Sequence, residues 1–345
     1  MKLSDFDYPL SPDRIAQFPV EPRDTSKLLV LEKKTGHIEH RIFHELPQVF
    51  RSGDLLVGNK TKVFPARLVG QKESTGAKVE FLLLHPISGD HWKVLIKRIK
   101  RARPNQRFVF GPGFSARIVE VLSDGMARVQ FESETPLSIN LNKFGSTPLP
   151  PYIRRNKGKK NTSDKNRYQT VYAEVDGSVA APTAGLHFTP SLIQKLSEKG
   201  IRFEKILLHV GYGTFKPVRT ENAEDYILDP EWIEITSSAT RTINGAKRDR
   251  KRIVAVGTTT TRTLESATDE SGNLSENSGL TNCYILPGYR FKTVDALITN
   301  FHLPKSTLLM LVCAFAGKAN ILKAYQEAID RGYRFYSYGD AMLIV

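Results

Sequence analysis

Histidines stand at three points where an apolar run gives way to small or polar residues. His187 ends the segment VAAPTAGLH, His209 ends ILLH, and His302 follows VDALITN, out of eight histidines in the chain. An imidazole exchanges a proton near neutral pH and also donates or accepts a hydrogen bond. Because ligands of open α/β sheets bind at the carboxyl ends of strands, the pattern predicts that the three histidines share one pocket. A single histidine at such a place is more often structural.

A threonine run offers a place for an anion. In GTTTTRTLES, Gly257–Ser266, an apolar strand ends at the glycine and the threonines open a helix. Hydroxyls and free backbone N–H groups at a helix N-terminus can bind a carboxylate or a phosphate. A threonine-capped helix with nothing bound explains the same residues. The segment ITNFHLPKST, Ile298–Thr307, repeats the arrangement with Asn300 and His302.

A pair of glycines after another apolar run gives a weaker signal. Gly211 and Gly213 in LLHVGYGTF resemble the opening of a dinucleotide or methyltransferase cofactor loop. The third glycine of such a loop is missing, and Pro217 stands where the following helix would begin. A glycine turn after a strand explains these residues about as well. No phosphate-binding loop of the form G-x-x-x-x-G-K-[ST] occurs in the sequence.

The net charge of the chain favours a polyanionic partner. It is +14 over 345 residues, so RNA or DNA is the first expectation and an anionic membrane the second. Six Lys or Arg residues lie in Lys97–Arg107 and seven in Arg154–Arg167. These two clusters favour a phosphate-binding face over a merely solvated surface. A third cluster, Lys247–Arg252, is interpreted as the solvated end of a helix.

Other features of the sequence favour a cytoplasmic protein without metal. The N-terminus, MKLSDFDYPL, lacks the apolar run of a signal peptide. The apolar stretch Leu308–Gly317 is about half the roughly 20 residues that span a bilayer, which indicates a buried helix and no membrane. Cys283 and Cys313 lie in apolar surroundings and are interpreted as core thiols. No pair of cysteines is spaced as a zinc site requires.

The hydrophobic patterning predicts an α/β fold with an inserted all-β domain. Short alternating runs such as VEFLLL, HWKVLIK and ARVQFES, separated by turns such as STGA and GPGF, predict a small β-barrel at 62–150. In the second half, strand and helix alternate, as in RIVAVG before TTTTRTLESA, which predicts a layered α/β domain with parallel strands. We predict that 1–61 and 151–345 form this domain together. The polar segment Glu270–Gly279 is predicted to be a mobile loop.

Several long segments resemble one enzyme family in the same order. They are DLLVGNKTKVFPARL, TPLPPYI, AAPTAGLHF, LHVGYGTFKPVR, AVGTTTTRTLES, VDALITNFHLPKSTLLMLVCAFAG and YRFYSYGDAML. The family is the S-adenosylmethionine:tRNA ribosyltransferase-isomerases of queuosine biosynthesis, and the resemblance spans essentially the whole chain. It implies transfer of the ribosyl part of S-adenosylmethionine to 7-aminomethyl-7-deazaguanine at the wobble position of tRNA with a GUN anticodon. It also implies rearrangement of the ribose to an epoxycyclopentanediol, loss of adenine and methionine, no metal, and an α/β domain with an inserted barrel.

This chemistry, with S-adenosylmethionine as co-substrate, suggests roles for residues in these segments. The sulfonium acidifies the ribose C5′ protons, adenine needs a proton donor as it leaves, and the methionine carboxylate needs hydrogen-bond donors. The candidate catalytic residues are His187, His302 and Asp340, the last as a partner for the sulfonium or the methionine amine. The candidate residues for binding the co-substrate are Thr183, Gly185, Gly211, Gly213, Thr258, Thr259, Arg262 and Asn300. We expect a monomer.

The sequence departs from the family pattern in two places. Where the pattern has D-H-x-M-H-x-E, Tyr226, Leu228 and Asp229 replace the two histidines and the methionine. Lys60 and Lys62 stand where Asn and Arg are expected. The first departure keeps open a second hypothesis, an RNA-binding protein that has lost its catalysis. The two glycines keep open a third, an S-adenosylmethionine-dependent methyltransferase.

Overall fold

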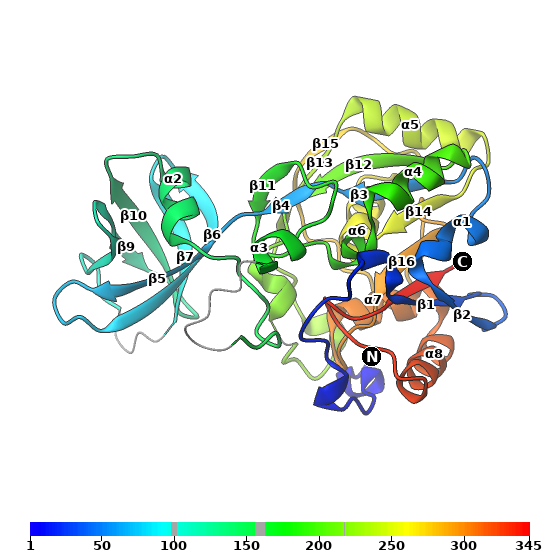
Figure 1. Ribbon diagram of the computed structural model, residues 1–345, viewed down its shortest axis with the longest axis horizontal. Coiled ribbons are helices and arrows are strands. Elements are labelled where there is room, and N and C mark those ends of the chain that lie inside the picture. Colours follow the sequence, from blue (N-terminus) through cyan, green and yellow to red (C-terminus); the bar gives the residue numbers. More distant parts are fainter. Residues whose placement is uncertain (98–101, 156–162, 217) are drawn as a thin grey trace.

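A computed structural model describes residues 1–97, 102–155, 163–216 and 218–345 of the chain. An α/β domain carries both termini, and a separate β-barrel stands beside it (Figure 1). The sequence-based fold class, a layered α/β domain with an inserted small barrel, is therefore confirmed.

A nine-stranded mixed sheet forms the centre of the α/β domain. Its strands, in spatial order, are β15 (Asn277–Thr281), β13 (Glu231–Ile235), β12 (Arg202–Leu208), β3 (Leu55–Asn59), β14 (Ile253–Val256), β16 (Ala296–Asn300), β17 (Ala341–Ile344), β1 (Lys27–Leu31) and β2 (Ile38–Ile42). The strands β12, β3, β14 and β16 run parallel, as does the pair β1 and β17. The outer pairs and the pair β16–β17 are antiparallel, so the expectation of parallel strands holds only for the centre of the sheet.

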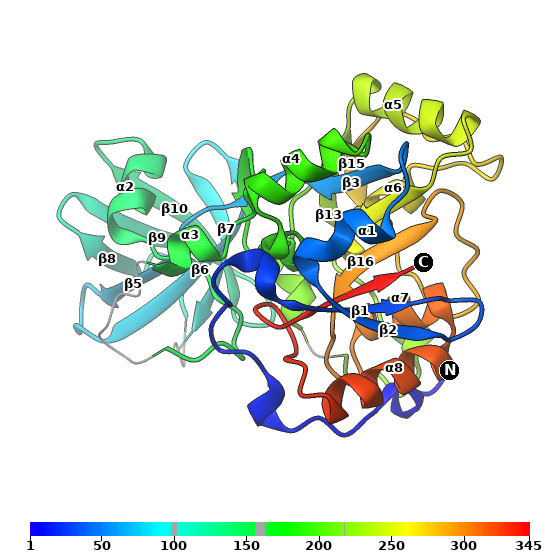
Figure 2. The ribbon, with the colours of Figure 1, turned by 45° about the vertical axis from the view of Figure 1, so that its right-hand side comes forward.

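Helices cover both faces of this sheet (Figures 1 and 2). They are α1 (Leu46–Val49), α4 (Pro190–Glu198), α5 (Ser237–Arg248), α6 (Thr258–Ser266), α7 (Thr307–Ala316) and α8 (Lys318–Asp330). The sheet separates two hydrophobic cores, and alternate residues of β3 contribute to each. Leu55 and Val57 pack with α5 to α8, whereas Leu56 packs with α1 and α4. Burial of both faces explains why the central strands read as continuous apolar runs.

Local sequence signals set the ends of several helices. The Thr189 hydroxyl accepts a hydrogen bond from the Leu192 amide at 3.1 Å, Pro190 opens α4, and Gly200 follows its end with a φ of +79°. Ser306 caps α7 in the same way through the Leu309 amide. These are the expected positions for a hydroxyl cap, an N-terminal proline and a C-terminal glycine.

The apolar helix α7 is buried and ends at Gly317, where the chain turns into α8. In the part of the chain that the structure describes, no single helix is long and apolar enough to cross a membrane. The helices α7 and α8 pass that test of length and composition only as a pair, bent by 114°.

The barrel is closed and entirely antiparallel. Its strands, in spatial order, are β10 (Met126–Ser133), β7 (His91–Lys97), β6 (Lys78–Ser88), β5 (Arg67–Lys72), β8 (Arg107–Gly111) and β9 (Phe114–Val121). Helix α2 (Leu137–Phe144) packs on the same core. These strands lie inside the predicted insertion, whereas the exact domain bounds, 61/62 and 150/151, stay a prediction.

A two-stranded sheet and a short helix lie between the two main parts. The strands β4 (Thr61–Val63) and β11 (Val175–Ser178) pair in parallel. The helix is α3 (Ser163–Arg167), and Figure 1 shows both elements next to the barrel side of the α/β domain. The segment 61–63 enters the barrel, so this small sheet fixes where the barrel joins the α/β domain.

Candidate functional site

A pocket lies at the carboxyl ends of β14 and β16, and we call it the strand-end pocket. Its walls come from the β14–α6 turn, the end of β16, the segment before the 3-10 helix Thr183–His187, and the turn before β17. The lining residues are Tyr152, Tyr168, Ala180, Ala181, Pro182, Thr183, Ala184, Val210, Thr214, Gly257, Thr258, Thr259, Thr299, Asn300, His302, Leu308, Tyr336 and Ser337. The lining combines small side chains with hydroxyl, amide and imidazole groups.

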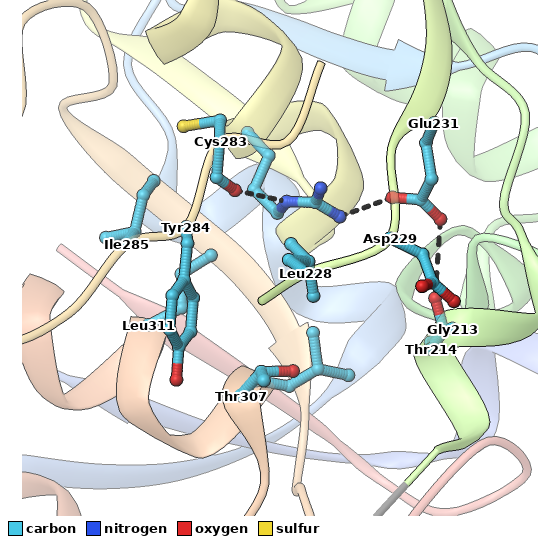
Figure 3. Close-up of a pocket in the computed structure, with 12 residues that line it drawn as sticks. Gly213, Thr214, Leu228, Asp229, Glu231, Cys283, Tyr284, Ile285, Thr307 and Leu311 are labelled. Carbon is cyan, nitrogen blue, oxygen red and sulfur yellow. Dashed lines mark hydrogen bonds and ion pairs between the residues drawn. The ribbon is translucent and has the colours of Figure 1, made fainter. Parts of the chain in front are cut away.

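A second pocket adjoins the first, and we call it the arginine pocket (Figure 3). The two pockets share the lining residues Thr214 and Leu308, so they lie side by side, and we call the two together the groove. The lining residues are Gly213, Thr214, Leu228, Asp229, Glu231, Arg262, Cys283, Tyr284, Ile285, Thr307, Leu308 and Leu311. An apolar wall from α7 therefore faces a charged wall from α6 and β13.

The threonine run divides its hydroxyls between the helix and the groove. The Thr260 hydroxyl donates to the Val256 carbonyl at 2.8 Å, and the Thr261 hydroxyl donates to the Gly257 carbonyl at 3.2 Å. Only Thr258 and Thr259 of the run line the strand-end pocket. Gly257 has a φ of +95°, which a glycine adopts without strain and which turns the chain from β14 into α6.

His187 lies one hydrogen bond behind the strand-end pocket. Its Nε2 is 3.2 Å from the amide nitrogen of Asn300, and its Nδ1 is 2.8 Å from the Ser26 hydroxyl. The Asn300 amide oxygen accepts from the Thr183 hydroxyl at 2.8 Å, which leaves the amide nitrogen to donate to His187. Burial, reinforced by Arg334, lowers the pKa of His187 to about 3. The imidazole is therefore neutral at pH 7 and orients Asn300.

His302 lines the strand-end pocket directly. Its Nε2 is 2.8 Å from the Thr299 hydroxyl, and its backbone amide donates to the Tyr325 hydroxyl at 3.1 Å. Burial lowers the pKa of His302 to about 3, so this ring is also neutral at pH 7. A neutral imidazole in this position can take part in hydrogen bonds to a bound molecule.

The third histidine of the sequence pattern lies elsewhere. His209 follows β12 and lines a cleft that faces the barrel, with its Nδ1 at 2.9 Å from the Thr61 hydroxyl. Strand β12 is separated from β14 by β3 and pairs with the outer strand β13, so its end opens toward the barrel. Of the three histidines, only His302 lines the strand-end pocket, so the expectation of one shared pocket is corrected: His209 lines the other cleft, and His187 reaches the pocket only through Asn300.

Asp340 lies outside both pockets. One carboxylate oxygen accepts from the Lys27 amide at 3.0 Å, and the other accepts from the Arg334 amide at 2.8 Å. The side chain is almost completely buried, with 2% exposed. These contacts join the start of β1 to the turn before β17, which indicates a structural role rather than contact with the sulfonium.

The glycines selected from the sequence have different physical reasons. A Cβ on Gly185 would lie 2.1 Å from the Tyr172 hydroxyl, so packing against that ring requires glycine there. A Cβ on Gly213 would lie 2.8 Å from a carboxylate oxygen of Asp229. Gly211 contributes its backbone amide, which donates to Glu231 at 2.8 Å. Only Gly213 of the three lines the groove.

A buried ion pair between Glu231 and Arg262 forms the charged wall of the arginine pocket. Arg262 Nη1 lies 2.5 Å from Glu231 Oε2, and both side chains are more than nine-tenths buried. Arg262 Nε donates to the Cys283 carbonyl at 2.8 Å. Among the described residues, Arg262 Nη2 has no hydrogen-bond partner although it is buried. A buried N–H without a partner costs free energy, so an anion that reached this atom would be stabilised by it.

The sequence analysis missed Glu231 as a site residue. It is the last position of the D-H-x-M-H-x-E pattern, so the unchanged glutamate of that pattern was the available signal. Two of the substituted positions, Leu228 and Asp229, also line the arginine pocket.

The substituted segment forms contacts of its own. Asp229 Oδ2 accepts from Lys216 Nζ at 2.7 Å, which ties the segment to the loop that follows Gly213. The Tyr226 ring meets the Tyr284 ring at a centroid distance of 6.1 Å. Lys60 and Lys62, the other departure, flank Thr61 at the entry to the barrel, and Lys62 Nζ lies 3.8 Å from Asp176.

Within the described ranges, no group of three or more His, Cys, Asp or Glu side chains is arranged to hold a metal ion. The geometry is thus a groove with hydroxyl, amide and neutral imidazole groups at one end and a guanidinium at the other. A cation next to backbone and hydroxyl donors is suited to a carboxylate, and the apolar wall of α7 is suited to a flat ring.

Comparison with known proteins identifies the family. The family model described as "Queuosine biosynthesis protein" matches residues 3–344. The S-adenosylmethionine:tRNA ribosyltransferase-isomerases of Desulfitobacterium hafniense and Moorella thermoacetica are 53% and 51% identical, each match covering 100% of both chains. The crystal structure of S-adenosylmethionine tRNA ribosyltransferase from Thermotoga maritima is 38% identical, with a TM-score of 0.56 over 99% of this chain and 100% of that one. The chain belongs to the S-adenosylmethionine:tRNA ribosyltransferase-isomerase family of queuosine biosynthesis.

Proposed function

We propose that this chain catalyses the family's reaction on tRNA. The ribosyl group of S-adenosylmethionine is transferred to the aminomethyl nitrogen of 7-aminomethyl-7-deazaguanine at the wobble position and isomerised to the epoxycyclopentanediol. Adenine and methionine are released, and the product is epoxyqueuosine in a tRNA with a GUN anticodon. The reaction takes place in the cytoplasm and needs no metal. The observation that carries this proposal is the pair of adjoining pockets that hold the threonine turn and the Glu231–Arg262 pair.

The chemistry of the residues that line the groove suits S-adenosylmethionine. Its methionine carboxylate is a suitable partner for Arg262 Nη2, the buried donor that lacks one. Glu231 holds the guanidinium in place and can attract the methionine ammonium group. At the other end, Thr258 and Thr259 line the same pocket as His302. These groups can bind the ribose hydroxyls and the adenine edge.

A relay of hydrogen bonds supports the reacting end. Ser26, His187, Asn300 and Thr183 form one connected chain at distances of 2.8 to 3.2 Å. In this proposal His187 acts as a positioning residue, because it reaches the pocket only through Asn300. His302 contacts the substrate itself and orients the departing adenine through a hydrogen bond. Burial keeps both rings neutral, so neither adds a cation next to the sulfonium.

The methyltransferase alternative has less support. After Gly211 the chain forms a 3-10 helix, Tyr212–Phe215, rather than the long helix that follows a dinucleotide-type glycine loop. The second alternative, an RNA-binding relative without catalysis, rests only on Tyr226, Leu228 and Asp229. The groove argues against it, because the threonine turn, Arg262 and His302 of the family's segments are all retained there.

Product analysis separates the three functions. The protein is incubated with S-adenosylmethionine and tRNA that carries 7-aminomethyl-7-deazaguanine, and the small molecules are resolved by liquid chromatography. The proposal expects adenine and methionine in equal amounts, together with the mass of epoxyqueuosine in the digested tRNA. S-adenosylhomocysteine would indicate a methyltransferase, and absence of turnover would contradict both enzymatic functions.

The substituted positions are tested by restoring the family pattern. We expect Tyr226→His plus Asp229→His to leave adenine release within a few fold of the parent chain, because neither parent side chain is required. Activity that appears only in the double variant would show that the parent chain has lost its catalysis. Binding of both substrates, measured separately by calorimetry, distinguishes that result from loss of folding.

A further inference from the structure

A large cleft separates the barrel from the outer edge of the nine-stranded sheet. Its volume is about 760 Å³, well above that of either pocket of the groove. Phe64, Trp92 and Leu141 line the barrel side, and His209, Trp232 and Leu280 line the opposite side. The cleft is therefore built from both parts of the molecule and is mostly apolar.

Both tryptophans of the chain line this one cleft. Trp92 lies on β7 of the barrel, and its ring is backed by Phe64 at a centroid distance of 5.9 Å. Trp232 lies on β13 and is 44% exposed, directly opposite Leu280, which is 69% exposed, in the pairing of β13 with β15. Folding alone does not bury these side chains, so they form a surface suited to a flat apolar partner.

The cleft adjoins the groove. Glu231 lines both the cleft and the arginine pocket, and Val210 lines both the cleft and the strand-end pocket. A molecule in the cleft therefore lies directly beside a substrate in the groove. A nucleotide next to the reacting base of a nucleic acid meets this requirement.

The charges around the cleft suit a polyanion. The Asp176 carboxylate in its wall lies 3.8 Å from Lys62 Nζ, and the Glu231 carboxylate is paired with Arg262. Neither carboxylate therefore presents an uncompensated charge to a phosphate. The Lys62 side chain is 46% exposed at this rim, and the whole chain carries a net charge of +14. A phosphate backbone can thus follow the rim while its bases enter the cleft.

We propose that this cleft binds unstacked bases of single-stranded RNA, next to the base that reacts in the groove, with Trp92 and Trp232 as the stacking surfaces. Recognition of RNA loops uses bases that stack on aromatic side chains in this manner. The inference rests on the proposed function, since an RNA substrate supplies the loop. It adds the part of the protein that holds the flanking nucleotides, and it assigns the barrel a direct role in binding them.

The two tryptophans provide the test, because no other residue of the chain contributes tryptophan fluorescence. Trp92→Phe and Trp232→Phe each leave a single reporter in the full-length protein. The probe is an anticodon stem–loop RNA with unmodified guanine at the wobble position, and the control probe is a fully paired RNA of the same length. We expect saturable quenching of each reporter by the stem–loop, and no quenching by the duplex or by S-adenosylmethionine alone.

Three results would overturn the inference. Unchanged fluorescence while electrophoretic mobility shows a bound stem–loop would place the RNA elsewhere. Quenching by S-adenosylmethionine without RNA would make the cleft part of the co-substrate site. Quenching that depends on protein concentration alone would show that a second copy of the chain covers the cleft. None of these results requires turnover, so failure of this inference is distinguishable from failure of the proposed function.

Substitution by alanine measures the contribution of each ring. Stacking of one base on an aromatic ring contributes about 1–3 kcal/mol, so Trp92→Ala and Trp232→Ala should each weaken stem–loop binding about 5- to 150-fold. The phenylalanine variants retain a ring and should bind within a few fold of the parent. Ile139→Ala, an exposed residue of α2 outside the cleft, is the matched control. Equal, small losses in all variants would contradict stacking.

Discussion

The Glu231–Arg262 pair concentrates charge where water is largely absent. Taking one partner away leaves the other charge buried without compensation, which typically costs about 3–5 kcal/mol of folding free energy. The Lys216–Asp229 pair lies beside the same pocket, but its side chains are 32% and 46% exposed. Exposed pairs contribute about 1 kcal/mol or less, because solvent screens them. The two pairs therefore provide a matched comparison.

We predict that Glu231→Gln lowers the free energy of unfolding by about 3–5 kcal/mol, measured by urea denaturation at pH 7. Asp229→Asn should lower it by about 1 kcal/mol or less. If S-adenosylmethionine uses Arg262, the first substitution should also raise the KM for S-adenosylmethionine more than the second. Equal effects of the two substitutions on stability would contradict the assignment of Glu231 as the anchor of the guanidinium.

The buried imidazole of His302 makes stability depend on pH. Its pKa is lowered from 6.5 to about 3 by burial, so between these values the unfolded chain binds a proton that the folded chain does not. Stability therefore rises with pH across this window, by at most about 1.4 kcal/mol per pH unit, and levels off above pH 6.5.

We predict that His302→Gln reduces the gain in stability between pH 4.5 and pH 6.5, measured as the difference between urea unfolding curves. Carboxylates that titrate in the same window affect parent and variant alike, so the difference isolates the imidazole. The control is His44→Gln, at an exposed position on the surface. A parent and a His302→Gln variant with the same pH dependence would show that folding does not lower the pKa of this imidazole.

At the scale of elements, the threonines of helix α6 have two different roles. Thr258 and Thr259 line the strand-end pocket, whereas the Thr260 hydroxyl is fully buried and donates to the Val256 carbonyl. A hydrogen bond to a charged group contributes about 1.5–3 kcal/mol, and a neutral one about 1 kcal/mol. Substitution by the isosteric valine removes either hydroxyl without a change of shape.

We predict that Thr258→Val raises the KM for S-adenosylmethionine about 5-fold, the loss of one neutral hydrogen bond, with a change in unfolding free energy below about 1 kcal/mol. Thr260→Val should lower stability by about 1 kcal/mol and leave this KM unchanged. Steady-state kinetics and urea denaturation of the same preparations give both values. The opposite assignment of effects would place the co-substrate away from the start of α6.

Elements with strong local signals could be predicted from the sequence. The runs RIVAVG and VDALITN form β14 and β16, and the segments after them form α6 and α7. The outer strands β13 and β15 were not predicted, because their pairing depends on backbone contacts between distant segments. The polar segment Glu270–Gly279 was predicted to be a mobile loop. Its end instead belongs to β15 (Asn277–Thr281), because pairing with β13 outweighs the polar sequence. Tertiary pairing of this kind leaves little trace in local composition.

The same distinction separates the site residues that were predicted from those that were not. Thr258, Thr259, Asn300 and His302 follow strands directly, so a local pattern was sufficient to place them in one pocket. Glu231 meets Arg262 across 31 positions of sequence, and no local pattern reveals that contact. Asp340 shows the opposite case. Its motif suggested a catalytic role, but its carboxylate accepts hydrogen bonds from two backbone amides.

At the scale of the whole molecule, the excess of positive charge is not evenly available. Residues 98–101 and 156–162, which belong to the two basic clusters, lie outside the described part of the chain. Of the described members, Lys97, Arg107, Arg155 and Arg167 are engaged in ion pairs with Glu80, Glu132, Asp164 and Glu21. Arg103, Arg154 and Lys165 are exposed. The latter three are therefore the described cations of these clusters that are most accessible to phosphate groups.

We predict that replacing Arg103, Arg154 and Lys165 together by glutamine flattens the salt dependence of tRNA binding. Each contact of a cation with a single-stranded phosphate contributes about −0.7 to the slope of log K against log salt, so loss of three contacts should reduce the slope by about 2. The control replaces Arg241, Arg248 and Arg250, three exposed cations in or just after α5, by glutamine and removes the same charge. Figure 1 shows α5 on the side of the α/β domain that is remote from the barrel. If the slope results from direct contacts, only the first variant changes the slope. If net charge alone matters, both variants weaken tRNA binding equally, and the phosphate-binding face lies elsewhere.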